Sequence, residues 1–344
     1  MIPAEAIAAA PGVELEPVRC AICGSDGAHE ACWGRDRLCG QPGEFRIVEC
    51  GGCSLTYLNP RPTARALEAF YPNEYPPHRP AAGNPAVPNR TRMWVKAWAA
   101  RWYTRGLQFD PVHVRETLCR IEDFPPYFPL GFFPTKPGGR LLDVGCGSGI
   151  YLHAFQKLGW EAYGVEISPG VAERARKTFG LNVITSELEE ARFPDGYFDV
   201  VTLIHVMEHL RHPVRTLQEV RRILTADGIA VVALPNLRSL ARLLFRAHWF
   251  HWDVPRHLYH YSPTSLRRLL AKVGGIRLVR VNHVPVANGF TGSWAYLCQE
   301  HPHLGKACPG WVISRLVPPL AWAAALAGLS DSIVVYVRKV AECP

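Results

Sequence analysis

The residues of this chain best suited to chemistry form a glycine-rich turn at residues 145–149. Residues 140–150 read RLLDVGCGSGI, an apolar run that leads into three glycines at alternate positions. This pattern predicts a buried strand, a tight turn and the start of a helix. Free backbone N–H groups in such a turn, together with the positive end of the helix dipole, bind the polar part of a nucleotide-like cofactor. The third glycine is Gly149, one residue before the place that the dinucleotide fingerprint requires, so the spacing does not favour NAD.

Three more segments follow the turn in the order expected of a nucleotide-binding sheet. A second apolar run ends at Glu166, about twenty residues after the turn, where a carboxylate can bind both hydroxyls of a ribose. A third run precedes Glu187 and Leu188, which suit the amino group and the face of an adenine ring. A fourth predicted strand, residues 198–204, leads into the sequence HVMEHL at 205–210. Together these segments predict a parallel α/β sheet with its ligand-binding residues at the carboxyl ends of the strands.

This order of motifs resembles the class I S-adenosylmethionine (SAM)-dependent methyltransferases. The resemblance covers about residues 135–285 and rests on LLDVGCGSG at 141–149, GVEIS at 164–168, FPDGYFDV at 193–200, HVMEH at 205–209 and LPN at 234–236. It implies a Rossmann-like α/β fold with a seven-stranded, mostly parallel sheet and an antiparallel last strand. A Rossmann-like NAD enzyme and a SAM fold without activity are the alternatives.

The resemblance also implies roles for individual residues around the turn. The glycines let the backbone approach the methionine part of SAM, and Asp143 helps to hold its ammonium group. Glu166 binds the ribose, and His205 lies near the methionine end. The residues expected to contact SAM are Asp143, Gly145, Cys146, Gly147, Gly149, Glu166, Ile167, Glu187, Leu188 and His205.

His209 is the candidate for the catalytic base. It follows the fourth predicted strand, at the edge where such sheets bind ligands, and an imidazole titrates near the working pH. Glu208 beside it could orient the ring or bind a cation. His205, Glu208 and His209 resemble the Glu-x-x-Glu-His cluster with which some quinone-type O-methyltransferases bind a divalent ion, but the first position here is His. A divalent ion at the active site is therefore one alternative, and a structural role for His209 at a helix start is another.

A second polar segment, WDVPRHLYH at residues 252–260, follows the fifth predicted strand. It would lie on the same rim of the sheet. Arg256 and His257 are candidates for contacts with the substrate, and we count His257 with His209 and Glu208 in the catalytic group. A purely structural role for the segment is the alternative.

Two C-x-x-C pairs near the N-terminus predict a structural zinc site. The expected ligands are Cys20, Cys23, Cys50 and Cys53. Two such pairs can complete a tetrahedral thiolate shell, which leaves no open position for catalysis. Gly24 supplies the relaxed backbone that such a knuckle needs, whereas Ser54 stands at the matching place of the second knuckle. The arrangement resembles a zinc ribbon, with a redox dithiol pair as the alternative, and Cys32 and Cys39 are expected to be free thiols.

The zinc knuckles, the LNPRP run at 58–62 and the SAM motifs together resemble one bacterial methyltransferase subgroup that is associated with the tailoring of small molecules or surface sugars. This implies methyl transfer to a small-molecule or sugar-containing (glycan) acceptor, at oxygen. The alternatives are an RNA methyltransferase that binds its substrate through the ribbon, and a non-catalytic SAM-binding module. The segment after the fourth strand lacks the Asn/Asp-Pro-Pro-aromatic motif, and no arginine-rich tract interleaved with aromatics occurs, so nucleic acid is not the favoured partner.

The chain is predicted to have four parts: a zinc ribbon at 15–60, a proline-rich linker and helical segment at 61–134, the SAM-binding core at 135–286, and inserted cap helices with the final strand at 287–344. Tryptophans at 94, 98 and 102 form a stripe on one predicted helix, as expected for domain packing or a lid. Residues 311–329 are apolar but interrupted by Arg315 and two prolines, which favours a cap helix over a membrane span, with peripheral membrane contact as the alternative.

Composition and charge place the chain among ordinary globular proteins. Its 344 residues carry a formal net charge of +8, and the basic residues are spread along the chain, so charge alone does not indicate nucleic-acid binding. The N-terminal residues lack the pattern of an export signal, and the 11 cysteines are an odd number. Reduced thiols and a cytoplasmic location are therefore expected.

Overall fold

The computed structural model describes residues 10–72, 138–157, 159–308 and 310–340. The predicted linker and the predicted helix with the tryptophan stripe lie outside the described residues. The part predicted at 61–134 is therefore described only up to residue 72.

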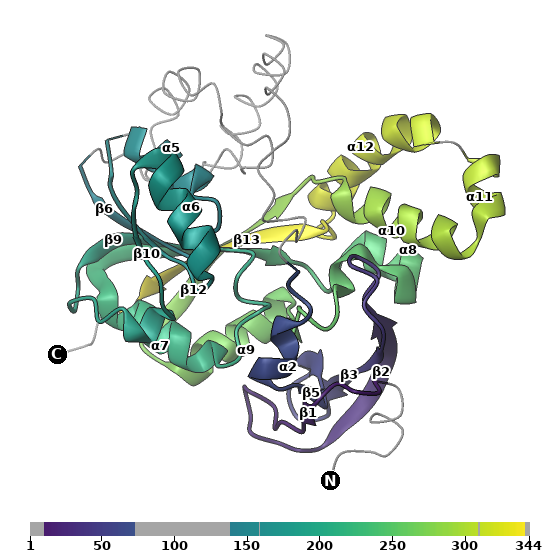
Figure 1. Cartoon of the computed structure of the whole chain (residues 1–344), viewed down its shortest axis with the longest axis horizontal. Coiled ribbons are helices and arrows are strands. Elements are labelled where there is room, and N and C mark those ends of the chain that lie inside the picture. The colour runs from purple at the N-terminus through teal and green to yellow at the C-terminus, as the bar shows by residue number, and fades with distance from the viewer. Residues whose placement is uncertain (1–9, 73–137, 158, 309, 341–344) are drawn as a thin grey trace. The chain divides into compact units, whose positions relative to one another are not determined.

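A seven-stranded sheet forms the framework of the chain (Figure 1). Its strands, in spatial order, are β12 (Ile276–Val284), β13 (Ser332–Lys339), β10 (Leu224–Pro235), β9 (Phe198–Ile204), β6 (Arg140–Val144), β7 (Glu161–Val165) and β8 (Asn182–Ile184). The strand β6 pairs in parallel with both β7 and β9, and β7 pairs in parallel with β8. The carboxyl ends of these strands therefore meet at one edge, and the predicted seven-stranded Rossmann-like fold is confirmed. The last strand of the chain takes an interior place, between β10 and β12.

The strands and helices begin and end where local sequence requires. Four of the five residues of β6 are buried, as expected for a continuous apolar strand in a parallel sheet covered on both faces. The helices that follow the strands are α5 (Ile150–Lys157), α6 (Pro169–Phe179), α7 (Pro213–Ile223) and α9 (Pro263–Val273). The helix α9 starts with a reciprocal capping box between Ser262 and Ser265. The strand β10 begins at Leu224 and includes Asp227 and Gly228, two residues that often form turns.

A second, antiparallel sheet contains the N-terminal part of the chain. Its four strands, in spatial order, are β11 (Tyr259–His260), β4 (Thr56–Leu58), β3 (Glu44–Cys50) and β2 (Ala28–Arg35). The short strands β1 (Leu15–Glu16) and β5 (Arg61–Pro62) pair beside them, and α2 (Ala64–Glu68) follows. The sequence predicted a ribbon confined to residues 15–60, but β11 pairs with β4 from about two hundred residues further along the chain. This strand satisfies backbone groups that an edge strand would otherwise expose.

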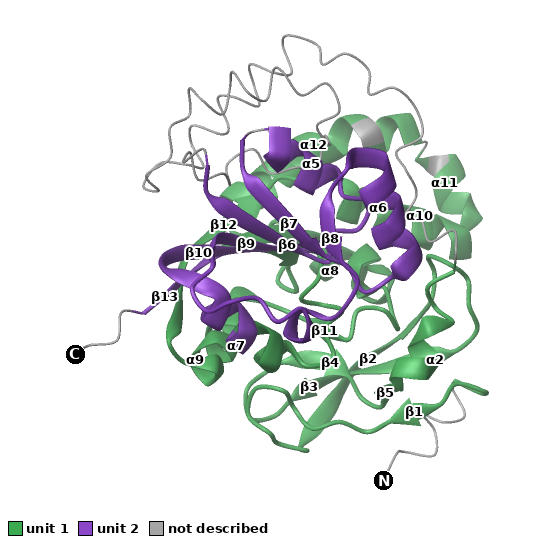
Figure 2. Ribbon diagram, turned by 60° about the vertical axis from the view of Figure 1, so that its left-hand side comes forward, with its two compact units in different colours: residues 1–75, 205–217, 233–335 green, residues 76–204, 218–232, 336–344 purple. Residues whose placement is uncertain are grey.

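Contacts divide the chain into two compact units (Figure 2). Unit 1 comprises residues 1–75, 205–217 and 233–335, and unit 2 comprises residues 76–204, 218–232 and 336–344. The N-terminal sheet, β12 and the helices α8 (Leu240–Phe245), α10 (Asn288–Glu300), α11 (Pro302–Ala307) and α12 (Gly310–Leu326) belong to unit 1. Each unit is assembled from separate stretches of chain, whereas the four predicted parts are continuous. The units therefore do not test the four-part division, which stays a prediction.

The apolar segment near the C-terminus forms α12, which continues through Pro318 and Pro319. Within the described residues, no helix combines the length and the apolar character that crossing a membrane requires.

Candidate functional site

The glycine-rich turn of unit 2 adopts a conformation that favours glycine at three places. Gly145, Gly147 and Gly149 have φ angles of 65°, 54° and 79°, in the left-handed region that residues with a Cβ rarely adopt. A Cβ on Gly149 would lie 2.5 Å from Cδ1 of Leu181, so this glycine is needed for packing. A Cβ on Gly147 would meet no atom within 4 Å, so the backbone there borders open space. The turn is packed at one end and accessible in the middle.

Glu166 is fixed by hydrogen bonds to the turn. The backbone N–H of Gly147 donates to Oε2 of Glu166 at 3.0 Å, and that of Ser168 donates to Oε1 at 2.9 Å. The residue is only 6% exposed. Each carboxylate oxygen keeps a further lone pair, so two hydroxyl groups of a sugar could still donate to it.

Asp143 lies at the end of β6, where the sequence predicts it will help to hold a cationic group. It is buried and accepts a hydrogen bond from Thr202 Oγ1 at 2.6 Å. Burial raises the pKa of Asp143 to about 7, despite that hydrogen bond. A nearby ammonium group would favour the ionised carboxylate and lower this pKa.

The other residues expected to contact SAM follow the ends of β7 and β8 or belong to unit 1. Ile167 is 66% exposed, which is unusual for a large apolar side chain. Glu187 is exposed and Leu188 is buried, at the start of a short 3-10 helix. Cys146 is buried in the turn. His205, the first residue after β9, belongs to unit 1, so its cofactor role stays a prediction.

A cluster of titratable side chains lies within unit 1. The potential ligand atoms of Glu208, His209 and His257 all lie within 4.8 Å of one another, so the structure brings the whole predicted catalytic group together. The rings of the two histidines are 4.7 Å apart and nearly perpendicular. Although burial alone would raise the pKa of Glu208, the hydrogen bond from His205 and the neighbouring histidines lower it to about 2. We refer to Glu208, His209 and His257 as the histidine cluster.

Two contacts hold the ring of His209. Its Nδ1 lies 3.0 Å from the hydroxyl of Tyr71 and 3.1 Å from the carbonyl oxygen of Arg256. A carbonyl can only accept, so the contact with Arg256 favours a proton on Nδ1 and a lone pair on Nε2. The sequence analysis did not identify Tyr71, because nothing local distinguishes a tyrosine that follows a short helix.

His257 is held as a neutral ring. Its Nδ1 lies 2.9 Å from the carbonyl oxygen of His251. Burial, followed by the proximity of His209, lowers the pKa of His257 to about 4. A neutral imidazole whose Nδ1 donates to a carbonyl has a lone pair on Nε2, the form that can bind a metal ion or accept a proton.

Arg256, a sequence candidate for substrate contact, is instead wholly buried. Its guanidinium group binds Asp36 with two hydrogen bonds, of 3.0 and 2.6 Å, and also contacts Asp253 at 2.6 Å. It further donates to the carbonyl oxygen of Phe70. Through these contacts, Arg256 fixes the segment that carries His257 against the N-terminal residues of the same unit.

The histidine cluster suits either proton transfer or a divalent ion. Glu208 Oε2 is buried and has no hydrogen-bond partner, which is costly for a carboxylate oxygen. One carboxylate and two imidazoles form a ligand set that zinc and other divalent transition metals accept. The residues therefore fit a bound cation.

The four predicted zinc ligands come together in unit 1. Sγ of Cys20 lies 3.3 Å from that of Cys53, and Sγ of Cys23 lies 3.4 Å from that of Cys50, with no disulfide. Zn–S bonds of about 2.3 Å separate the sulfurs of a tetrahedral site by about 3.8 Å, so the cluster is close to the size that zinc requires. Cys32 and Cys39 form no disulfide, as expected.

The two knuckles have the same backbone geometry. The backbone N–H of Gly24 donates to the carbonyl oxygen of Cys20, and that of Ser54 donates to the carbonyl oxygen of Cys50, both at 2.8 Å. Ser54 adopts φ of 55°, against 75° at Gly24. The serine that departs from the sequence pattern therefore takes the conformation that its glycine counterpart adopts without strain.

Comparisons with known proteins agree with this geometry. Residues 128–274 match a family model described as a methyltransferase domain. A ubiquinone biosynthesis O-methyltransferase from Cereibacter sphaeroides is 28% identical over 196 residues, which cover 52% of this chain and 79% of that protein. The enzyme of the same name from Maricaulis maris is 28% identical over 219 residues, covering 56% and 83%.

Among solved structures, a SAM-dependent methyltransferase from Archaeoglobus fulgidus matches with 22% identity and a TM-score of 0.41, covering 60% of this chain and 88% of that one. The family match runs from before β6 through α9 and includes the glycine-rich turn. These residues are therefore similar to methyltransferase domains, in a chain that also carries a four-cysteine cluster.

Proposed function

We propose that this protein transfers the methyl group of SAM to an oxygen atom of a small-molecule acceptor. The observation that carries the proposal is the glycine-rich turn, in which Gly147 borders open space and donates to Glu166. The O-methyltransferase names of the relatives support oxygen as the methylated atom. A sugar-containing acceptor stays an alternative within the same chemistry.

The residues of unit 2 are proposed to bind the cofactor. The Asp143 carboxylate attracts the ammonium group, and Glu166 accepts hydrogen bonds from the ribose hydroxyls. Glu187 and Leu188 receive the adenine, and the exposed Ile167 covers an apolar face. Bound SAM supplies a methyl group that is already activated by the positive sulfur, so the protein has to align the acceptor and remove its proton.

His209 is proposed as the base that removes this proton. Its Nδ1 contacts the carbonyl oxygen of Arg256, which leaves Nε2 to accept a proton from the acceptor hydroxyl. The buried carboxylate of Glu208 lies beside the ring and stabilises the imidazolium that forms. His257, which packs against His209, limits the rotation of that ring.

A divalent ion in the histidine cluster is the second candidate for activating the acceptor. The unpartnered Oε2 of Glu208 favours it. An ion held by Glu208, His209 and His257 would lower the pKa of a hydroxyl group bound to it. Treatment with a chelator should then abolish turnover under conditions in which metal analysis finds the zinc of the cysteine cluster retained. Full turnover after such treatment would exclude the ion and leave His209 as the base.

Zinc in the cysteine cluster is proposed to be structural, because four thiolates leave no open coordination position. The variant Cys50→Ala should lose the metal and unfold the N-terminal sheet, since binding free energy in such sites is also folding free energy. Metal analysis and circular dichroism measure both effects. Cys32→Ala is the matched control and should keep about one zinc ion per chain.

The cytoplasmic location and a peripheral membrane contact through residues 311–329 stay predictions. Within this segment, Trp311 and Leu326 are 63% and 83% exposed. Co-sedimentation of the protein with vesicles, compared between the unaltered chain and Trp311→Ser, tests the contact.

Calorimetry and methyl labelling test the proposed function. The zinc-loaded protein should release heat on mixing with SAM and with its demethylated thioether product, and should not respond to NAD. Incubation with methyl-labelled SAM and a bacterial metabolite extract should then yield a labelled small molecule. Transfer of the label to RNA instead would overturn the acceptor class. Normal SAM binding without any transfer would leave only a cofactor-binding module.

A further inference from the structure

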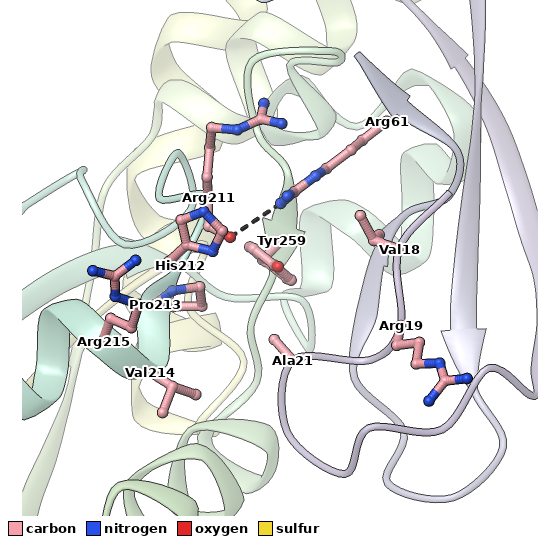
Figure 3. Close-up of a pocket in the computed structure, with 10 residues that line it drawn as sticks. All are labelled: Val18, Arg19, Ala21, Arg61, Arg211, His212, Pro213, Val214, Arg215 and Tyr259. Atoms are coloured by element: carbon pink, nitrogen blue, oxygen red, sulfur yellow. Dashed lines mark hydrogen bonds between the residues drawn. The ribbon is translucent and has the colours of Figure 1, made fainter. Parts of the chain in front are cut away.

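A pocket of about 310 Å³ lies within unit 1, apart from the histidine cluster (Figure 3). It is lined by Val18, Arg19, Ala21, Arg61, Arg211, His212, Pro213, Val214, Arg215 and Tyr259. Neither Glu208, His209 nor His257 is among these residues. The volume is near the lower limit for small-molecule sites, about 300 Å³, so the pocket suits a compact group and not an extended ligand.

Positive charge dominates the lining. Arg61 and Arg211 both pair with the carboxylate of Glu16. No ion pair joins Arg19 or Arg215 to an acidic residue in the part of the chain that the structure describes. Arg61 reaches toward the middle of the group, whereas Arg19 and Arg215 lie on opposite sides of it with their guanidinium groups turned outward (Figure 3). The pocket therefore has an excess of positive charge in the absence of a ligand.

The start of α7 adds to this excess. Pro213 is the first residue of this 11-residue helix, and the first turn contains no acidic residue. The positive end of a helix dipole favours anions and disfavours cations. Arg215 nevertheless stands in this first turn, beside the exposed His212. The positive charge of Arg215 is therefore disfavoured by the helix dipole, and a bound anion would offset this effect.

The remaining lining includes apolar residues next to the first zinc knuckle. Ala21 directly follows Cys20 of the first zinc knuckle, and Val18 lies two residues before that cysteine. Tyr259 is 3% exposed and lies in the sheet that the knuckles support. A metal bound by the cysteine cluster would thus hold one wall of the pocket in place.

We propose that this pocket binds the phosphate or diphosphate group of a small ligand. Arginine forks match phosphate oxygens with paired hydrogen bonds, and several positive groups around a compact cavity suit a multiply charged anion. The exposed side chains of Arg19 and Arg215 would turn inward on binding, and the phosphate would then neutralise their charge and complement the start of α7. The site goes beyond the proposed methyl transfer, because it requires neither SAM nor turnover.

Calorimetric titration of the zinc-loaded full chain with inorganic pyrophosphate tests the site. Pyrophosphate should bind, and its affinity should fall several-fold when NaCl rises from about 0.05 M to about 0.5 M. The variants Arg19→Gln and Arg215→Gln should each weaken binding by about fivefold to tenfold, because both side chains are exposed and can be changed without disturbing the core. Arg267→Gln is the matched control, since Arg267 is an exposed arginine in the 11-residue helix α9 of the same unit. It should leave the affinity unchanged.

Two results would overturn the proposal. One is the absence of pyrophosphate binding in a zinc-loaded protein that still melts cooperatively. The other is equal weakening by Arg215→Gln and the control, which would indicate nonspecific attraction to a basic protein.

A lipid headgroup is the other source of a phosphate group, and vesicles distinguish it from a soluble ligand. If the ligand is soluble, vesicles of phosphatidylglycerol should not retain the protein more than vesicles of phosphatidylcholine. Retention that pyrophosphate cannot displace, and that Arg19→Gln and Arg215→Gln leave intact, would contradict a soluble ligand in this pocket.

Discussion

The glycine-rich turn of unit 2 and the histidine cluster of unit 1 are built in different ways. The turn takes its conformation and its donors from residues 143–149, a continuous stretch of backbone. The histidine cluster takes its side chains from separate segments: His209 contacts Tyr71, 138 positions away, and Arg256, 47 positions away. A backbone site is therefore specified locally, whereas a side-chain site depends on the packing that brings distant segments together.

This difference predicts opposite responses to distant substitutions. The segment that carries His257 is held by Arg256, whose partner Asp36 lies 220 positions away in the sequence. Changes far from the cluster should therefore alter it, whereas the turn should respond mainly to changes among its own residues and the residues packed on them.

The largest effect is expected when the buried ion pair is broken. The variant Asp36→Ala removes the two-pronged partner of the buried Arg256 guanidinium and leaves Asp253 as its remaining carboxylate, so it should lower the free energy of unfolding by about 3 kcal/mol. Denaturant unfolding measures this change, with the exposed Asp26→Ala as the control. A loss equal to that of the control would mean that Arg256 does not hold the cluster.

The next effect is expected at His209, the proposed base. The variant His209→Ala should lower turnover by about a hundredfold or more, equivalent to about 2.7 kcal/mol, because no group then accepts the proton of the acceptor. Its affinity for SAM should stay the same, as calorimetry can establish. Unchanged turnover would exclude His209 as the base. The histidine cluster would then have no catalytic role to set against the glycine-rich turn.

An intermediate effect is expected at Glu166, the carboxylate proposed to bind the ribose. The variant Glu166→Gln replaces a charged acceptor by a neutral one, and should weaken SAM binding by about 1.5–3 kcal/mol, at least tenfold. Calorimetry with SAM tests this change, and the exposed Asp227→Asn in the same unit is the control. If both variants bind SAM as the unaltered protein does, the cofactor is held elsewhere.

The smallest of these effects, about 1 kcal/mol, is expected at Gly147, and Gly149 of the same turn serves as its comparison. Gly147→Ala should destabilise unit 2 by about 1 kcal/mol, the cost of a left-handed backbone, because its Cβ meets no atom. Gly149→Ala adds a clash with Leu181, so its loss should be larger, about 2–4 kcal/mol in total. Although Gly147→Ala should reduce stability less than Gly149→Ala, it should weaken SAM binding, because the new Cβ would occupy the open space beside the turn. Equal melting temperatures for the two variants would contradict this assignment.

The sequence was sufficient wherever a structure depends on neighbouring residues. The strand before the turn and the paired zinc knuckles both have local causes, and both lie where the pattern predicts. Ser54 is a partial exception, because its type suggested a departure from the knuckle and its backbone conformation does not. A propensity describes what a residue prefers, and a firmly packed knuckle can impose another conformation on it.

By itself, the sequence determined the chemistry available to this protein: a cofactor turn with its carboxylate at Glu166, four thiolates in two pairs, and imidazoles after two strands. Only the tertiary structure decided which of these groups meet. It joined His257 and Tyr71 to His209, buried Arg256 as a structural cation and added β11 to the N-terminal sheet. The physical reason is that hydrogen bonds of a turn close within a few residues, whereas contacts between distant side chains form only when the whole chain packs.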